Sequence, residues 1–187
     1  MSETGSDLEL VGRTVPDRPR ALELPALVVV CGLPGVGKST VARRVAARID
    51  ADVLRSDVVR KELFVDPAYT AAETATVYDE LFERAGDRLR GEAATSVVLD
   101  ATFKTRRRRA DARALADRVD RPFRLVHVDC AESVVERRIA EREGVSDADF
   151  QVHREFRELF DPVRRADLTV DNSGSLAETR RQVDEAF

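Results

Sequence analysis

Continuous apolar runs alternate along the chain with stretches in which apolar residues recur three and four positions apart. The clearest run is Leu27 to Cys31, five apolar residues in succession, which is typical of a strand covered on both faces. Apolar runs of similar length predict further strands. These strands are expected at 51–57, 96–100, 123–128 and 166–170.

Helical periodicity fills the intervals between the predicted strands. Val41, Val45 and Ile49 are spaced four apart and predict a helix directly after the first strand. The same spacing, with capping signals at Thr70, Thr105 and Ser175, predicts further helices, and places Leu159 and Leu176 on the buried faces of the last two. These helices are expected at 58–64, 70–90, 105–119, 131–143, 146–162 and 175–187. Alternating strands and helices predict a three-layer α/β/α fold around a five-stranded parallel sheet.

Residues 1–24 lack this periodicity. They combine Ser, Glu, Gly and Asp with Pro16 and Pro19, and their apolar residues are scattered. We therefore expect a mostly disordered leader. The remaining residues, 25–187, have the length of a single domain with its own core.

Composition narrows the classes of partner and the compartment. A net charge of −4 gives no general attraction to nucleic acid, which lowers the expectation of a nucleic-acid substrate without removing it. No run approaches the roughly 18 apolar residues that a membrane span needs, and the first residues lack a signal-peptide core. Two cysteines, Cys31 and Cys130, are too few for a disulfide framework, and we expect them to be buried thiols in a cytoplasmic protein.

The stretch G-L-P-G-V-G-K-S-T joins the first strand to the first helix. Its glycines allow a tight turn that points successive N–H groups into one concavity, and the helix N-terminus adds positive charge. The pattern therefore predicts a P-loop for ATP, with Lys38 over the β- and γ-phosphates and the Ser39 hydroxyl on Mg²⁺. The expected nucleotide-binding residues are Gly32, Leu33, Pro34, Gly35, Val36, Gly37, Lys38, Ser39 and Thr40.

Polar residues follow the other strands at the edge where the P-loop lies. Ligands bind beyond the carboxyl ends of parallel strands, so Asp57, Asp100 and Thr102 are expected on one rim. Asp57 is the candidate general base, and Arg60 would hold a polar or anionic acceptor. The alternative is that Asp57 only caps a helix. Asp100 is the candidate carboxylate that orients Mg²⁺, as in a Walker B strand, unless it is an ordinary strand-ending acid.

Several arginines are candidates for neutralising the negative charge of the phosphate groups. Arg138 and Arg142 lie four apart on one predicted helix and would close over the transferring phosphoryl group as part of a short lid near 131–147, although a solvated face is an equal alternative. Arg106 to Arg109 lie at the N-terminus of their helix, where positive charges oppose the helix dipole. We expect them either to meet anions or acidic side chains or to form a solvated face. The solvated face is the simpler interpretation. His127 is expected in the core and His153 on a helix surface, and neither is assigned a role.

These segments together resemble the small P-loop kinases of the AAA_33 or "predicted kinase" group, which is similar to gluconate kinase, chloramphenicol phosphotransferase, zeta toxins and the kinase domain of bacteriophage polynucleotide kinase. The resemblance covers about residues 26–187. It depends on G-L-P-G-V-G-K-S-T at 32–40, R-S-D-V-V-R at 55–60, V-V-L-D-A-T at 97–102 and R-R-I-A-E-R at 137–142.

The resemblance implies a strand order of 2-3-1-4-5 and a division of roles among the site residues. Asp57 would be the base and Arg60 the ligand of an acceptor phosphate, and Arg142 or Arg138 would assist transfer. The loop from Asn172 to Gly174 would contact the adenine side of ATP. No stretch matches the acceptor pocket of any one named member.

The preferred hypothesis is an ATP-dependent kinase that phosphorylates a hydroxyl of a small molecule or of a nucleic-acid 5′ end. A GTPase is excluded because the single asparagine, Asn172, is followed by Ser173, so no N-K-x-D motif exists. The length and the lack of L-S-G-G-Q disfavour an ABC-type or AAA+ motor. A regulatory nucleotide-binding module, or an ATPase without an acceptor, stays open, as does the oligomeric state.

Overall fold

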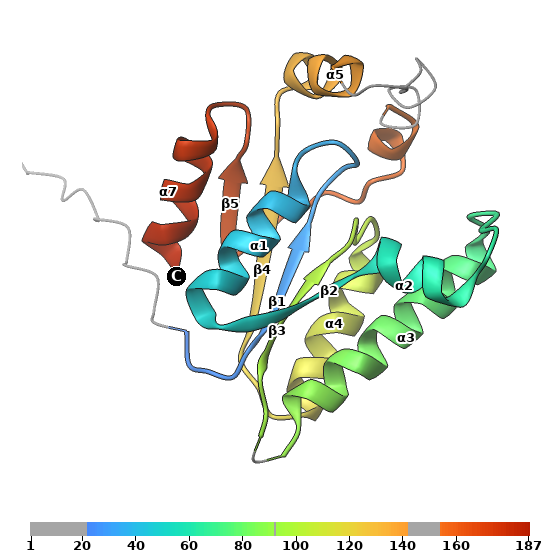
Figure 1. Ribbon diagram of the computed structural model, residues 1–187, viewed down its shortest axis with the longest axis vertical. Coiled ribbons are helices and arrows are strands. Elements are labelled where there is room, and N and C mark those ends of the chain that lie inside the picture. Colours follow the sequence, from blue (N-terminus) through green and yellow to red (C-terminus); the bar gives the residue numbers. More distant parts are fainter. Residues whose placement is uncertain (1–21, 92, 142–153) are drawn as a thin grey trace, which may run out of the picture.

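The computed structural model describes residues 22–91, 93–141 and 154–187. Figure 1 shows the helices and strands of these residues. One of them is a short helical stretch at 154–158. In chain order they are β1 (Leu27–Cys31), α1 (Lys38–Ile49), β2 (Ala51–Arg55), α2 (Ser56–Leu63), α3 (Ala71–Leu89), β3 (Ser96–Asp100), α4 (Arg106–Arg118), β4 (Phe123–Asp129), α5 (Glu132–Ala140), β5 (Leu168–Asp171) and α7 (Leu176–Ala186).

The five strands form one parallel sheet in the order β2-β3-β1-β4-β5, which confirms the predicted order. β1 is central: Val30 lies opposite Asp100 of β3, and Cys31 lies opposite His127 of β4. All the strands point the same way in Figure 1, so their carboxyl ends share one edge of the sheet. The loop that follows β1 therefore starts at the middle of that edge.

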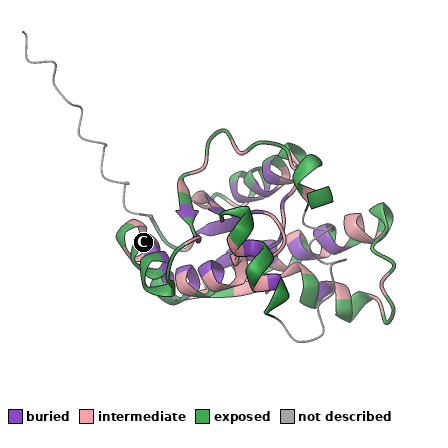
Figure 2. Ribbon diagram, turned by 90° about the horizontal axis from the view of Figure 1, so that it is seen from above, coloured by how far each residue is buried: buried purple, intermediate pink, exposed green. Residues whose placement is uncertain are grey.

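Alternate residues of β1 enter two separate cores, as the period of two in a strand requires. Leu27, Val29 and Cys31 pack in the core that α3 and α4 cover. Val28 and Val30 pack in the core that α1 and α7 cover. This arrangement gives the predicted three layers, and Figure 2 shows the buried strands between helices that turn exposed faces outward.

The helix adjoining the P-loop and the long third helix follow their predicted patterns. The α1 stripe of Val41, Val45 and Ile49 is buried. At the start of α3, the Thr70 hydroxyl accepts a hydrogen bond from the backbone N–H of Glu73, as a cap should. The return half of that capping box differs, because the Glu73 carboxylate accepts from the backbone N–H of Ala68.

Four predictions about single residues were wrong. Leu159 and Leu176 are exposed, and Leu176 lies in the first turn of α7, at the rim where the chain leaves the sheet. His127 is half-buried against the ring of Phe160 and is not a core residue. Both cysteines are free thiols, but only Cys31 is buried, while Cys130 is half-buried.

The second strand also ends earlier than predicted. It stops at Arg55, and α2 begins at Ser56, so Asp57 lies in the first turn of that helix and not at the end of the strand. The N-cap of α2 is Arg55, whose side chain makes no capping bond. Asp57 is therefore not the N-cap of α2.

The predicted leader and the predicted lid lie only partly within the described residues. Of the predicted leader, 1–24, residues 1–21 lie outside the described residues, and of the predicted lid, 131–147, only the part to residue 141 lies within them. Among the helices of the described part of the chain, none combines the length and the apolar character needed to cross a membrane.

Candidate active site

The loop after β1 ends in a helix N-terminus that is free to face an anion. Gly37 is the N-cap of α1, with a φ of 93°, a conformation that favours glycine. Within α1, which is described over its whole length, no side chain caps the N-terminus and the first turn holds no acidic residue. The first N–H groups of a helix lack partners in the helix itself, so a phosphate is a suitable ligand for them.

The start of the loop is fixed by close contacts with the neighbouring strands. A Cβ on Gly32 would lie 2.4 Å from the carbonyl oxygen of Val128 in β4, so only glycine fits there. The N–H of Gly32 donates to the carbonyl of Thr102, just after β3, at 3.3 Å. Thr102, which was expected on this rim, therefore lies directly beside the P-loop.

Lys38 folds back over the loop. Its Nζ donates to the carbonyl of Leu33 at 2.8 Å. Burial lowers the pKa of Lys38, and the negative charges of Asp100 and Asp57, with the thiol of Cys31, act to raise it. The ammonium of Lys38 is therefore close enough to both carboxylates to interact with their charges.

Asp100 is the last residue of β3 and only 5% of it is exposed. The strand register places it opposite Val30 of β1 and Arg55 of β2. The Nε of Arg55 lies 3.4 Å from Oδ2 of Asp100. The buried carboxylate thus has a cation on the β2 side, in addition to Lys38 from the P-loop side.

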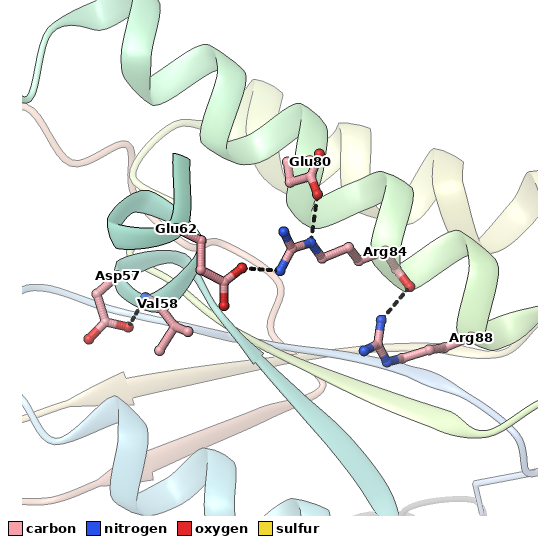
Figure 3. Close-up of polar contacts among 6 residues, drawn as sticks. All are labelled: Asp57, Val58, Glu62, Glu80, Arg84 and Arg88. Atoms are coloured by element: carbon pink, nitrogen blue, oxygen red, sulfur yellow. Dashed lines mark hydrogen bonds and ion pairs between the residues drawn. The ribbon is translucent and has the colours of Figure 1, made fainter. Parts of the chain in front are cut away.

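The same guanidinium also holds Asp57. Arg55 donates from Nη2 to Oδ2 of Asp57 at 2.8 Å. Oδ1 of Asp57 accepts from the N–H of Val58 at 3.0 Å, a contact that Figure 3 shows. The Asp57 side chain is 58% exposed, so an acceptor can reach it. No pattern in the sequence assigns Arg55 a role, because only the register of β2 against β3 shows that it joins the two carboxylates.

Arg60 is packed against the start of α3. Its Nη2 donates to the Thr74 hydroxyl at 3.1 Å, and its Nη1 lies 3.6 Å from Oε2 of Glu73. Its guanidinium covers the ring of Tyr69, 4.8 Å from the ring centre. Nη1 and the facing Glu73 oxygen are buried without a hydrogen-bond partner among the described residues. The side chain of Arg60 is therefore held in place, and one of its nitrogens keeps its donor capacity.

A second contact fastens α2, which carries Asp57 and Arg60, to α3. Arg84 of α3 donates from Nη1 to Glu62 of α2 and from Nε to Glu80, one turn away on α3 (Figure 3). The two helices thus form one unit beside the carboxyl ends of β2 and β3.

The predicted lid arginines are only partly placed. Val135 and Ile139 of α5 pack over the P-loop, where a Cβ on Gly35 would come within 2.9 Å of Val135. Arg138, on the same helix, points its Nη1 toward Sγ of Cys130 at 3.5 Å. Arg142 lies outside the described residues. A lid role for either arginine stays a prediction.

Asn172, at the turn after β5, lies directly against the P-loop. It is buried, its Nδ2 donates to the carbonyl of Val36 at 2.7 Å, and its Oδ1 accepts from the Thr179 hydroxyl at 2.6 Å. Gly174 is exposed nearby. The predicted contact of this loop with adenine stays a prediction. No sequence pattern indicates that Thr179 contacts Asn172, because a single threonine on a helix is not part of any motif.

The four arginines at the start of α4 differ in burial. Arg106 and Arg107 are exposed, Arg108 is half-buried and Arg109 is buried. Arg109 donates to the carbonyls of Phe103 at 2.8 Å and Asp161 at 2.9 Å. The carboxylate of Asp161 accepts from the N–H of Arg106, so an acidic neighbour does meet this helix N-terminus.

A pocket of about 230 Å³ lies beside the P-loop on the β4 side. Its lining is mainly apolar, with three polar side chains from β4 and from the segment after the predicted lid. The lining residues are Leu33, Val36, His127, Val128, Asp129, Arg157, Phe160, Pro162 and Val163. Burial lowers the pKa of His127, so this imidazole is neutral at pH 7.

The family model of an AAA domain, AAA_33, matches residues 27–163, which is most of the chain and includes the P-loop, Asp57 and Asp100. The chain belongs to this family.

Relatives of this AAA domain include much longer proteins. It is 35% identical over 141 residues to Rv2004c of Mycobacterium tuberculosis (strain ATCC 25618 / H37Rv) and to Mb2027c of Mycobacterium bovis, both named as uncharacterized proteins. The match covers 67% of this chain and 28% of each relative. The chain thus corresponds to little more than a quarter of their length.

Solved structures similar to this AAA domain include two named kinases. The Mycobacterium tuberculosis APS kinase CysC, in complex with AMPPNP and APS, has a TM-score of 0.64 at 22% identity, covering 86% of this chain and 96% of that one. A gluconokinase from Sinorhizobium meliloti 1021 has a TM-score of 0.65 at 25% identity, covering 85% and 89%. The AAA domain therefore has the fold of P-loop kinases.

The donor set suits a magnesium nucleotide better than a metal held by protein alone. Among the described residues, no three His, Cys, Asp or Glu side chains group to hold a metal ion. Mg²⁺ is usually bound by one or two protein oxygens together with substrate phosphates. Ser39, in the first turn of α1, and the buried carboxylate of Asp100 fit that pattern.

Proposed function

We propose that this AAA domain is an ATP-dependent kinase that transfers the γ-phosphate to a hydroxyl group of a small molecule or of a nucleic-acid 5′ end. One observation carries the proposal: a P-loop lysine, a buried strand-ending carboxylate and an exposed carboxylate lie at one edge of the sheet. These are Lys38, Asp100 and Asp57, and Arg55 joins the two carboxylates. A phosphoryl-transfer site needs these groups together, because each neutralises or moves a different charge.

Binding and alignment of ATP fall to the P-loop and its neighbours. The N–H groups at the start of α1 bind the phosphates, and the ammonium of Lys38 moves from the Leu33 carbonyl onto the β- and γ-phosphate oxygens. Ser39 and Asp100 hold Mg²⁺, which when bound neutralises phosphate charge. The loop of Asn172 and Gly174 lies on the adenine side.

Transfer itself requires one proton acceptor. As the acceptor oxygen forms its bond to the γ-phosphorus, the bond from that phosphorus to the β–γ bridging oxygen breaks and ADP leaves with the electron pair. Asp57 takes the proton of the acceptor hydroxyl. Arg60 and Thr102 position the acceptor, and Arg138 or Arg142 contributes positive charge at the transferring group.

One finding supports the class of reaction, and two others concern the compartment and the acceptor. Two structures to which the fold is similar are named as kinases, one with AMPPNP and APS bound. Cys31 and Cys130 are free thiols, as expected in the reducing cytoplasm, where we propose the protein acts. The net charge of −4 favours a small molecule over a nucleic acid.

Transfer of labelled γ-phosphate from Mg·ATP to a panel of acceptors tests the proposal. The panel contains 5′-hydroxyl oligonucleotides, sugars and sugar acids, and aminoglycoside and chloramphenicol-type antibiotics. Wild type is compared with Asp57→Asn and with Asp50→Asn. Asp50 is a matched control because it lies at the opposite end of α1 in a left-handed conformation that asparagine also tolerates.

We expect one class of acceptor to be labelled by wild type and by Asp50→Asn. Asp57→Asn should bind ATP as wild type does while losing transfer by about 100-fold or more, the size of a general-base contribution. Full transfer by Asp57→Asn would show that Asp57 is not the base. Binding of ATP without transfer to any member of the panel would favour a regulatory module instead.

A further inference from the structure

The turn between β5 and α7 is joined to the P-loop through one buried amide. Asn172 donates from Nδ2 to the carbonyl of Val36 at 2.7 Å and accepts at Oδ1 from the hydroxyl of Thr179 at 2.6 Å. Asn172 and Thr179 are both buried. The amide thus links the middle of the P-loop to the first turns of α7, across 136 residues of sequence.

Asn172 also occupies the space that a side chain at position 37 would need. A Cβ built on Gly37 would lie 2.1 Å from Nδ2 of Asn172. Gly37 immediately precedes α1, so its backbone sets the direction of the first N–H groups of that helix. The contact with Asn172 therefore acts at the residue that aims these groups.

Thr179 is itself held in place. Its backbone N–H donates to the carbonyl of Ser175, and Ser175 and Glu178 form a complete capping box at the start of α7. The Thr179 hydroxyl has one proton, and the shorter of its two contacts is the one to Asn172, at 2.6 Å against 3.2 Å to the Ser175 carbonyl. A rigid helix start thus fixes the orientation of the Asn172 amide.

We propose that Asn172 and Thr179 are positioning residues that hold the P-loop in its phosphate-binding conformation. The inference rests on the proposed function in that ATP is the ligand. A protein that adopts its binding-competent conformation only part of the time binds more weakly by that fraction. Without the Thr179 hydroxyl, the amide of Asn172 loses the bond that orients it, and the P-loop samples other conformations.

The test uses Thr179→Val, which removes the hydroxyl and keeps the branched shape. Dissociation constants are measured by calorimetry for Mg·ATP and for Mg·tripolyphosphate, which has no adenine. We expect both constants to rise about tenfold, the effect of losing one buried hydrogen bond. Thr179→Ser should restore both. Thr169→Val, the same change at an exposed position of β5, should leave both unchanged.

The choice of ligands separates this role from a direct contact with adenine. If Asn172 acts on adenine, Thr179→Val weakens ATP and leaves tripolyphosphate binding unchanged, which would overturn the proposal. Unchanged binding of both ligands would overturn it too. In an Asn172→Ala background, Thr179→Val should have no further effect, because the hydroxyl acts through that amide. An added loss in the double variant would contradict the proposal.

Hydrogen exchange of the nucleotide-free protein tests the positioning role of Asn172 and Thr179 separately from the proposed kinase function. Thr179→Val should speed exchange of the backbone amides of Val36 to Lys38 relative to wild type, while exchange in α3 stays the same. Thr169→Val should speed neither. If wild type binds no nucleotide, the proposed kinase function fails, and the exchange of these amides still decides whether Asn172 and Thr179 brace the loop.

Discussion

Arg55 and Asp100 lie opposite each other at the ends of β2 and β3, with 3.4 Å between Nε and Oδ2. Because Asp100 is buried, its charge needs a partner when no cation is bound between it and a phosphate. Arg55 supplies that partner and at the same time donates to Asp57. One guanidinium thus contacts both the proposed magnesium ligand and the proposed base.

Replacing Arg55 with methionine should lower kcat more than it weakens ATP binding. The methionine keeps the length of the side chain but cannot hold Asp57, whose exposed carboxylate then loses its fixed orientation. We expect kcat to fall about 10- to 100-fold, as misplacement of a catalytic group does. Steady-state kinetics with the acceptor found in the panel measure this. Arg88→Met is the control, because it removes an ion pair to Asp52 on the exposed surface. It should change neither kcat nor the affinity for ATP. Equal losses in kcat and ATP affinity would contradict the positioning of Asp57 by Arg55.

Lys38 should contribute to function at a cost in stability. Its pKa is lowered in the folded state by burial, so the unfolded chain binds its proton more tightly. The charged lysine therefore destabilises the folded state at neutral pH, and this cost disappears as the pH rises from the lowered pKa toward the ordinary value of 10.5. Lys38→Met should melt at a higher temperature than wild type at pH 7, and the difference should shrink toward pH 10.

The same Lys38→Met protein should fail to bind and turn over ATP. Lys61→Met, at an exposed position of α2, serves as the control and should keep both the wild-type melting temperature and ATP binding. A lower melting temperature for Lys38→Met at pH 7 would show that the bond of Lys38 to the Leu33 carbonyl outweighs the cost of burial.

The fold followed from periodicity because the strands and helices that build its core have strong, uniform patterns. The apolar run of β1 and the four-residue spacing of Val41, Val45 and Ile49 leave few alternatives. Element ends were less predictable. The strand was predicted to run to Asp57, whereas β2 stops at Arg55 and α2 begins at Ser56. No Gly or Pro between residues 51 and 63 marks this boundary.

In the candidate site, too, local features were predictable from the sequence and contacts between distant segments were not. The P-loop is local, so its spacing alone predicted the glycine turn and the helix that follows it. The contact of Arg55 with Asp100 depends on strand register. Arg109 contacts Asp161, 52 residues away, and Thr179 reaches the P-loop only through Asn172, which contacts Val36 136 residues away. Such contacts leave no mark in a single sequence, which is why four adjacent arginines appeared equivalent.

Cys31 should be far less reactive than Cys130. Burial raises the pKa of the Cys31 thiol to about 11, so almost no thiolate exists at pH 8, and the side chain is inaccessible in the core between β1 and the α3 and α4 layer. Iodoacetamide at pH 8 should label Cys130 in the native protein, and Cys31 only after unfolding. Mass spectrometry of peptides locates the label. The Cys130→Ser variant should stay unlabelled until denaturant is added, and rapid native labelling of Cys31 would show that the core opens locally.

Arg109 should be a structural residue, although it follows two exposed arginines, Arg106 and Arg107. Its guanidinium donates to the backbone carbonyls of Phe103 and Asp161, joining the loop after β3 to the segment before β5. Arg109→Met leaves both carbonyls without this donor, and we expect the free energy of unfolding to fall by about 3 kcal/mol, the range for hydrogen bonds to a charged group. Urea denaturation measures the change. Arg107→Met, two positions away and exposed, should stay within about 0.5 kcal/mol of wild type. Equal stability of the two variants would mean that the buried guanidinium gains no more from these carbonyls than an exposed one gains from water.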